Sequence, residues 1–367
     1  MSKYCIEDLK ERLGNLVMAE LDIRYNCLLG LDSTVKERIM REWNETESVS
    51  AVQALLLTYE LTTYLRSHKT PYKINGALSS SLISWLLGIT FTNPLPAHRY
   101  CPHCKTIEWH QEYDDGFDIP GACCPNCGEE MESDGHNILS GIFWNAPKPT
   151  IEISIEMSKQ EEILQWLSKN PLADKKNEWQ PKYYIDGSLG IVYIGALHLA
   201  FGNYNFTSDF YERHISLHDL PAMLGVNEDQ RKKYQLPEPE SFSQLVASNS
   251  ILKQMAGVLP KHRKVFSKDL SCCRDSIYLY LIRHGIPPKT AWIQMKQAIF
   301  GKGISCITEE MKNAPDSYMI EVCSTCTYLW PKSAIVEGIL HSLRKNEDGE
   351  NNTHRVLLHE AQDDTVI

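Results

Sequence analysis

Apolar residues recur every three or four positions near both ends of the chain, and they alternate with polar residues only near its middle. This spacing predicts amphipathic helices within residues 1–30 and over residues 50–66. A further helix is expected to start at Asp32, Ser33 or Thr34, which are suitable N-cap residues. The residues that share the apolar face of the first helix are Leu9, Leu13, Leu16, Val17 and Leu21.

The middle of the chain changes character. Three serines at 79–81 can start a short apolar helix that ends near Gly88, because glycine commonly ends helices. Isoleucines alternate with polar residues over 151–156, which predicts a β-strand. The pattern is helical again from Ser241, and the polar, acidic tail after Leu343 is expected to be disordered.

Two cysteine pairs stand out because each has the spacing C-x-x-C: Cys101 with Cys104, and Cys124 with Cys127. Four thiolates at this spacing form the tetrahedral ligand set that zinc prefers, and they leave no open position for a substrate. We therefore predict a closed, structural zinc site, with Cys123 as a spare thiol. The alternative is a set of free cysteines in a reducing compartment.

Composition narrows the classes of function. The 367 residues are 43% hydrophobic and 23% charged, as in ordinary globular proteins, and are enough for several domains. A net charge of −10 argues against a general electrostatic grip on nucleic acid, so any DNA contact needs a local basic patch. Twelve cysteines with zinc spacing, and no signal peptide or transmembrane run, predict a cytoplasmic protein without a membrane partner.

The segments around the cysteine pairs resemble the zinc segment of the bacterial DNA polymerase III alpha subunit of the PolC type, a C-family polymerase. The matching segments, in family order, are Asn93-Pro94-Leu95-Pro96, Gly116-Phe117-Asp118-Ile119-Pro120 and Asp134-Gly135-His136. The resemblance continues over most of residues 34–343. It implies an α+β fold with a degenerate nucleotidyltransferase-like palm, a zinc-ribbon-type insertion and mostly helical fingers. No counterparts are seen for the family's exonuclease, PHP, helix-hairpin-helix or clamp-binding parts.

The resemblance also implies a division of the chain into six parts. These are a helical leader (1–33), a first palm part (34–99), a thumb-like zinc module (100–147), a shortened second palm part (148–225), helical fingers (226–343) and an acidic tail (344–367).

The catalytic carboxylates of the family are degenerate in this chain. Two-metal phosphoryl transfer needs carboxylates that hold both ions close together. Where the family strand carries aspartates, this chain has Thr150 and Glu152. The third family aspartate aligns with Ala222. Glu152, Glu156 and Asp219 are the residual catalytic candidates, and surface carboxylates are the alternative role of the two glutamates.

Nucleotide and DNA contacts are implied by the same resemblance. The family's glycine-rich triphosphate turn keeps one glycine, Gly76, and has lost its arginine and serine. Ser80 and Ser81 could meet an anion, although helix capping is the simpler role. The fingers keep cations at Arg274, Lys302 and Lys332. A basic run near residue 260 adds the DNA-contact candidates Lys261, Arg263 and Lys264.

These features together predict a PolC-like core fragment or paralogue that takes part in DNA replication without polymerising DNA. It would bind zinc structurally, and magnesium only if catalysis is retained. Its partners would be primer-template or single-stranded DNA, replisome proteins, or both. The alternatives are a residual or split DNA polymerase, and a replisome-mimicking inhibitor or adaptor from a mobile element. The lone pair Cys323 and Cys326 could join Cys272 and Cys273 in a second metal site.

Overall fold

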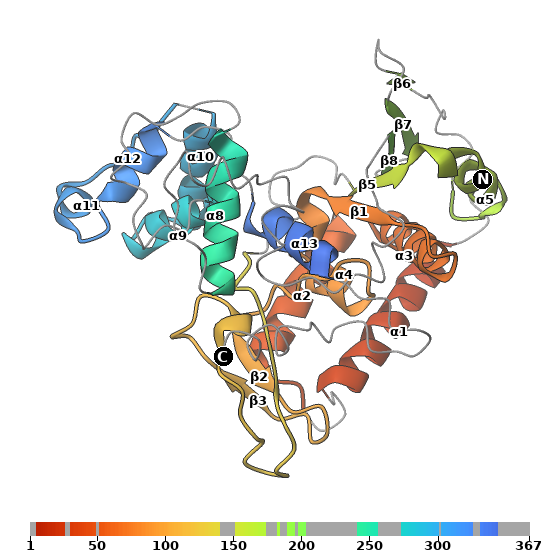
Figure 1. The fold of residues 1–367 in the computed structure, drawn as a ribbon, viewed down its shortest axis with the longest axis horizontal. Coiled ribbons are helices and arrows are strands. Elements are labelled where there is room, and N and C mark those ends of the chain that lie inside the picture. Colours follow the sequence, from red (N-terminus) through yellow and green to blue (C-terminus); the bar gives the residue numbers. More distant parts are fainter. Residues whose placement is uncertain are drawn as a thin grey trace, which may run out of the picture. The chain divides into compact units, whose positions relative to one another are not determined.

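The computed structural model describes most of the chain. The described residues are 5–25, 30–48, 51–139, 151–173, 182–183, 189–194, 197–202, 241–255, 273–300, 302–325 and 331–343. They form two compact units, the first made of residues 1–214 with 340–367 and the second of residues 215–339. The fold is a mixture of helices and small sheets, as the α+β prediction requires (Figure 1).

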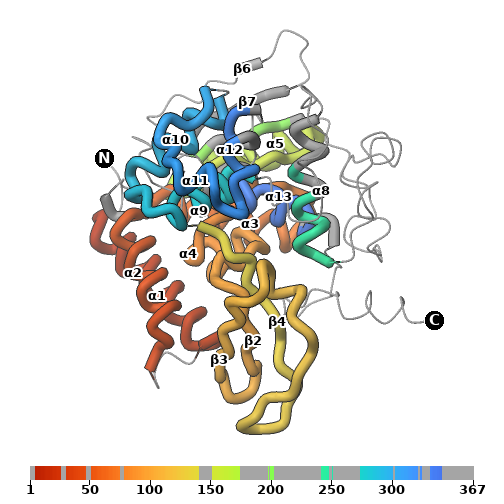
Figure 2. The backbone as a smooth tube through the Cα atoms, turned by 90° about the vertical axis from the view of Figure 1, so that its left-hand side faces the viewer, coloured from red at the N-terminus to blue at the C-terminus, as the bar shows by residue number. Residues whose placement is uncertain are grey.

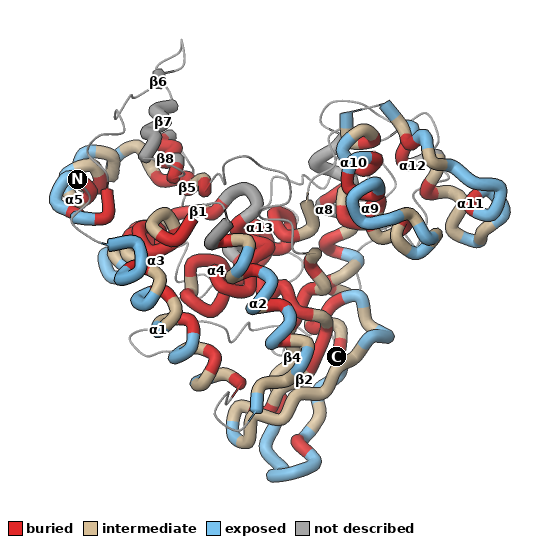
Figure 3. Tube along the Cα trace, turned by 180° about the vertical axis from the view of Figure 1, so that it is seen from behind, coloured by how far each residue is buried: buried red, intermediate tan, exposed pale blue. Residues whose placement is uncertain are grey.

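The first unit begins with three helices, as the apolar spacing predicts. They are α1 (Ile6–Tyr25), α2 (Ser33–Ser48) and α3 (Val52–Ser67). The predicted cap of α2 is confirmed, because Asp32 Oδ1 accepts hydrogen bonds from the backbone N–H of Thr34 at 2.8 Å and Val35 at 3.4 Å. Buried residues concentrate in α3, α4 and β1, while α1 and α2 each keep an exposed face (Figure 3).

A five-stranded sheet packs with these helices, and its strand order is β1-β5-β8-β7-β6. The strands are β1 (Tyr72–Asn75), β5 (Ile151–Glu156), β6 (Lys182–Tyr183), β7 (Leu189–Ile194) and β8 (Leu197–Gly202). β5 runs parallel to β8 and antiparallel to β1, and the three lie side by side in Figure 1. Helix α5 (Gln160–Lys169) follows β5 after the short 3-10 turn η4 (Met157–Lys159).

The alternation that predicted β5 has a clear cause. Ile151, Ile153 and Ile155 are each at most 1% exposed and join the main core, whereas Glu152 and Glu156 on the other face are partly exposed. Burying three isoleucine side chains stabilises the strand by about 5–9 kcal/mol before entropy losses are counted. The strand is therefore stabilised mainly by the burial of its isoleucine face, and the face that carries Glu152 and Glu156 contributes less to this packing.

A three-stranded antiparallel sheet forms the frame of the predicted zinc module. From here on this name denotes residues 98–139, which are the described residues of the predicted range 100–147 together with the start of β2. Its strands are β2 (His98–Tyr100), β3 (Ile107–Trp109) and β4 (Glu132–Asp134), in the order β3-β2-β4. In Figure 2 the strands run side by side into the loops that carry the cysteine pairs. The module keeps a small core of its own, made of Cys101, Cys124 and Met131.

Two glycines explain the motifs at the base of this module. A Cβ on Gly116, which opens the turn η3 (Gly116–Asp118), would lie 1.9 Å from the Asp134 carbonyl oxygen. Gly135 has φ +92°, and a Cβ there would lie 2.2 Å from the Pro96 carbonyl oxygen. Backbones this close exclude any side chain, so both positions require glycine.

Two short elements follow β1. The 3-10 turn η2 (Gly76–Ser80) leads into α4 (Leu82–Leu86) in the first unit. The second unit contains α8 (Phe242–Met255), α9 (Arg274–Arg283), α10 (Pro288–Ile299), α11 (Glu309–Asn313) and α12 (Tyr318–Thr325), and most of α13 (Lys332–Leu343). No helix in the described ranges is both long and apolar enough to cross a membrane.

Candidate metal centre and carboxylate strand

The four predicted cysteines converge. The sulfur atoms of Cys101, Cys104, Cys124 and Cys127 all lie within 4.8 Å of one another. The distance is 3.4 Å both between the sulfurs of Cys101 and Cys127 and between those of Cys104 and Cys124. A tetrahedral zinc ion with Zn–S bonds of about 2.3 Å needs sulfur atoms about 3.8 Å apart. Disulfides would require about 2.05 Å. The set could therefore hold a metal such as zinc, and it is the only such group found among the described residues.

The two cysteine pairs share one backbone geometry. In the first, the Lys105 N–H donates to the Cys101 carbonyl at 2.9 Å, and in the second the Gly128 N–H donates to the Cys124 carbonyl at 2.9 Å. The residue after each pair is left-handed, with φ +61° at Lys105 and +78° at Gly128. This turn points both sulfurs of a pair to the same side.

A hydroxyl next to the metal centre was not foreseen from the sequence. The Asn126 side-chain amide donates to Thr106 Oγ1 at 2.8 Å, and Thr106 Oγ1 lies 3.1 Å from Cys104 Sγ. The Thr106 hydroxyl is the main cause that lowers the pKa of Cys104 to about 6. The thiolate, the form that binds metal, is therefore favoured at neutral pH. A threonine two residues after a C-x-x-C pair is the only signal in the sequence.

The zinc module is strongly acidic. Residues 98–139 hold nine aspartates and glutamates against two cations, Arg99 and Lys105, so this segment carries −7 of the chain's −10. A zinc ion with four thiolates would add about −2. This charge would repel the phosphate backbone of a nucleic acid.

Among the described residues, no cluster of potential metal ligands includes a glutamate of the carboxylate strand. Glu152 and Glu156 both lie on β5, four residues apart. At about 3.3 Å per residue their Cα atoms are about 13 Å apart. Side chains on a strand stand roughly perpendicular to the sheet, so the two carboxylates would share one ion only if both leaned toward each other along the strand. Asp219, the third catalytic candidate, and Ala222 and Thr150 of the family alignment lie outside the described residues.

The turn that resembles the triphosphate cradle lies beside this strand. Asn75, the last residue of β1, pairs with Glu152, and Gly76 opens η2 directly afterwards. The predicted capping role of Ser81 is confirmed, because its side chain accepts from the Ser84 N–H at 3.1 Å. Ser80 and Ser81 are only 3% and 2% exposed, so neither can reach a ligand without rearrangement.

A protein carboxylate already occupies the start of α4. Glu42, fully buried on α2, accepts hydrogen bonds from the Ser81 hydroxyl at 2.8 Å, the Leu82 N–H at 3.0 Å and the Ile83 N–H at 3.2 Å. Helix N-termini bind anions through such free N–H groups. Glu42 fills this position in the structure, and the nucleotide contacts of Ser80 and Ser81 stay a prediction.

Arg38 balances the buried charge of Glu42. Its Nε donates to Glu42 Oε1 at 2.5 Å, and its two other nitrogens donate to the carbonyls of Ser80 at 2.7 Å and Ile138 at 2.9 Å. One guanidinium thus joins α2, the η2 turn and the end of the zinc module. This network fixes the orientation of the three segments.

The predicted finger cations differ in their surroundings. Lys302 is exposed, and Arg274 Cζ lies 6.0 Å from the centre of the Trp292 ring. The Lys332 backbone N–H donates to Asp275 Oδ2 at 2.8 Å, which caps α13. The basic-run candidates Lys261, Arg263 and Lys264 lie outside the described residues.

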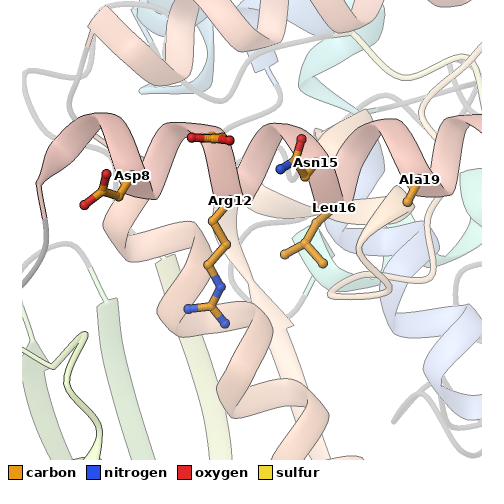
Figure 4. Close-up of a pocket in the computed structure, with 6 residues that line it drawn as sticks. Asp8, Arg12, Asn15, Leu16 and Ala19 are labelled. Carbon is orange, nitrogen blue, oxygen red and sulfur yellow. The ribbon is translucent and has the colours of Figure 1, made fainter.

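Two further features remain. A groove of about 410 Å³ along α1 is lined by Asp8, Glu11, Arg12, Asn15, Leu16 and Ala19 (Figure 4). The groove is lined by one helix only, and the Arg12 guanidinium is already paired with Glu60 at 2.6 Å.

The second predicted metal site is only partly described. Cys323 and Cys273 are buried, but Cys272 and Cys326 lie outside the described residues, so the second metal site stays a prediction.

Comparison with known proteins agrees with the resemblance seen in the motifs. No model of a protein family matches the chain. Over 92% of its length, however, it is 23% identical to the PolC-type DNA polymerase III of Clostridium perfringens. The chain is similar to PolC-type DNA polymerase III. A shorter stretch, 38% of the chain, is 35% identical to the PolC-type enzyme of Thermotoga maritima, and 73% of the chain is 23% identical to that of Bacillus subtilis.

The similarity is confined to part of each PolC-type relative. The chain covers 32% of the Clostridium perfringens protein, 27% of the Bacillus subtilis protein and 10% of the Thermotoga maritima protein. The chain therefore spans no more than about a third of the length of these PolC-type proteins.

Proposed function

We propose that the chain is a PolC-like DNA-replication factor that binds DNA and does not polymerise it. The observation that carries the proposal is the polar face of β5. The resemblance gives this strand the position of the family's catalytic carboxylates. Glu152 is the one carboxylate left at the matching positions of the strand, and the Cα of Glu156, its other glutamate, is about 13 Å away. The strand would then belong to a degenerate palm.

The chemistry explains why this loss would be decisive. Two metal ions stabilise the attacking and leaving oxygens during phosphoryl transfer, and most of the catalysis is positioning and charge stabilisation. Each ion needs carboxylates that converge on it. A chain with one glutamate where two aspartates are expected would keep the palm scaffold but lose most of the rate of phosphoryl transfer.

A second partner is suggested by the zinc module. Its charge of −7 does not suit DNA, but it complements a basic protein surface. An adaptor role, in which the module contacts a replication protein and another surface contacts DNA, is consistent with both charges. The rigid zinc centre would keep the acidic loops in a fixed arrangement.

Primer extension and DNA binding test the proposal together. We expect no nucleotide incorporation with magnesium or manganese, and binding of primer-template or single-stranded DNA that weakens as salt rises. The control is Glu112→Ala, an exposed glutamate outside β5. Incorporation that Glu152→Ala abolishes and Glu112→Ala preserves would overturn the proposed loss of polymerase activity.

A further inference from the structure

The exposed side of α10 carries a stripe in which lysines alternate with apolar side chains. Its members are Lys289, Ile293, Lys296 and Phe300, the last being the C-cap residue. Their spacing of four, three and four residues puts all of them within about 60° of one another around the helix. Ile293 is 45% and Phe300 is 64% exposed, and both lysines are exposed. We call these four residues the α10 stripe.

The opposite side of α10 is a conventional core face. Ala291, Trp292, Met295 and Ala298 are buried there. Trp292 also contacts one residue of the stripe, because Lys296 Nζ lies 5.4 Å from the centre of the Trp292 ring, within cation–π distance. The helix is therefore anchored by one face, and Ile293 and Phe300 lie on its other, exposed face.

The chain segment that carries the stripe is mostly basic. Residues 273–303 contain five lysines and arginines against one acid, Asp275, and α10 itself contains no acid. Asp275 is buried and accepts from the Lys332 N–H, so it does not neutralise the surface. This segment has a net charge of +4 within a chain of −10, and the zinc module has −7. An anionic ligand is complementary to the stripe and not to the module.

We propose that the α10 stripe binds single-stranded DNA. Lys289 and Lys296, about 10 Å apart along the helix, would neutralise phosphates, and a base would stack on Phe300. Duplex DNA fits less well, because its bases are already stacked on one another. The acidic tail at 346–364 also fits less well, since it contains no aromatic residue to stack on Phe300. The inference rests on the proposed DNA-binding function and locates it.

Fluorescence anisotropy with a labelled oligo-dT of about 20 nucleotides tests the stripe in the full chain. We expect Lys289→Glu/Lys296→Glu to weaken binding by more than about tenfold and to reduce the log–log salt slope by about 1.4, because each lost phosphate contact on a single strand removes about 0.7. Phe300→Ala should weaken binding about tenfold and leave the slope unchanged. Thermal melting checks that each variant is folded.

The matched control is Lys36→Glu/Lys312→Glu, which changes the net charge equally at exposed lysines outside the stripe. It should weaken binding by less than about threefold. If wild type binds and both stripe variants bind equally well, the stripe assignment is wrong and the proposed function stands. If wild type binds no DNA of any kind, the proposed function itself fails. A synthetic 346–364 peptide that binds wild type and not Lys289→Glu/Lys296→Glu, while DNA binding is the same in both, would also overturn the assignment.

Discussion

Cys123 and Cys124 are neighbours in the chain with different surroundings. Cys124 is 3% exposed and its sulfur lies 3.4 Å from that of Cys104, whereas Cys123 is exposed and pairs through its backbone with Glu130. The side chains of adjacent residues in extended backbone point in opposite directions. Only one of the two thiols can therefore reach the metal centre.

Replacing one thiol at a time distinguishes the two. Cys124→Ser should lower bound zinc from one equivalent per chain to none and reduce the free energy of unfolding on the order of 4 kcal/mol, since a lost structural metal is among the largest single effects. Cys123→Ser should keep the zinc and the stability. Zinc release measured with a chromogenic chelator, and urea unfolding, give both values. Equal zinc contents in the two variants would contradict the assignment.

His98 is a buried histidine at the base of the zinc module. Its Nδ1–H donates to the Pro96 carbonyl at 2.7 Å, and its Nε2 has no hydrogen-bond partner among the described residues. Burial lowers the pKa of His98, and it outweighs the nearby Asp134 carboxylate and the Pro96 carbonyl, which raise it. The neutral ring is therefore the form that the fold accepts.

This histidine predicts acid sensitivity. The unfolded chain takes up a proton on His98 below about pH 6.5 and the folded chain does not, so stability is complete above that pH and falls as the pH drops, by up to about 1.4 kcal/mol per unit. His98→Asn keeps a donor near the Nδ1 position and should flatten the decline. Urea unfolding between pH 7.5 and 5 measures this, with exposed His68→Asn as the control. A decline equally steep in His98→Asn and wild type would contradict the role of His98.

At this scale the sequence predicts ligands better than their surroundings. The four cysteines were identified by their spacing, because a metal turn is a local structure. Thr106, Asn126 and Glu42 were missed, because their contacts depend on how segments meet in space. Glu42 lies 39 residues before the Ser81 hydroxyl that it accepts from, and no local pattern encodes that distance.

The elements α2 and α4 are held together by the Arg38–Glu42 pair. Both side chains are buried, with 8% and 0% exposed, and the pair joins the start of α4 to the end of the zinc module. Removing one partner of such a pair leaves an unbalanced buried charge.

We expect Arg38→Met to lower the free energy of unfolding by about 3–5 kcal/mol. Arg38→Met/Glu42→Leu should recover part of this loss, because no lone charge is left behind. The exposed pair Lys312–Glu309 serves as the comparison, and Lys312→Ala should cost less than about 1 kcal/mol. Urea unfolding of these variants and of Glu42→Leu alone measures the coupling, and additive losses would show that the two buried charges act independently.

Individual helices and strands could be predicted from local sequence patterns, whereas the order of the strands in the sheet could not. The isoleucine alternation predicts β5, and Asp32 and Ser81 mark where α2 and α4 begin. The order β1-β5-β8-β7-β6 joins β1 to a strand that starts 76 residues after β1 ends at Asn75, at Ile151. Such pairing depends on long-range packing, and the family resemblance suggested a palm without giving this order.

Across the whole molecule, charge is segregated. Residues 98–139 carry −7 and residues 273–303 carry +4. Long-range repulsion from the acidic module should slow and weaken the approach of DNA to any basic surface of the same chain, and salt should screen it.

Neutralising part of the module tests this effect. Glu112→Gln/Glu129→Gln removes two exposed carboxylates and should strengthen DNA binding about two- to fivefold at 50 mM salt. The gain should disappear near 0.5 M salt, where the Debye length is only about 4 Å. Anisotropy titrations at both salt concentrations measure it. Tighter binding that persists at high salt would indicate direct contact between the module and DNA.

Glu42 gives the chain a resident anion at the start of α4. Because it is covalently attached and held by three hydrogen bonds from this helix start, its effective concentration exceeds that of any nucleotide added in solution. A triphosphate could bind there only by displacing a carboxylate that also neutralises Arg38. We therefore expect added nucleotides to compete poorly for the start of α4.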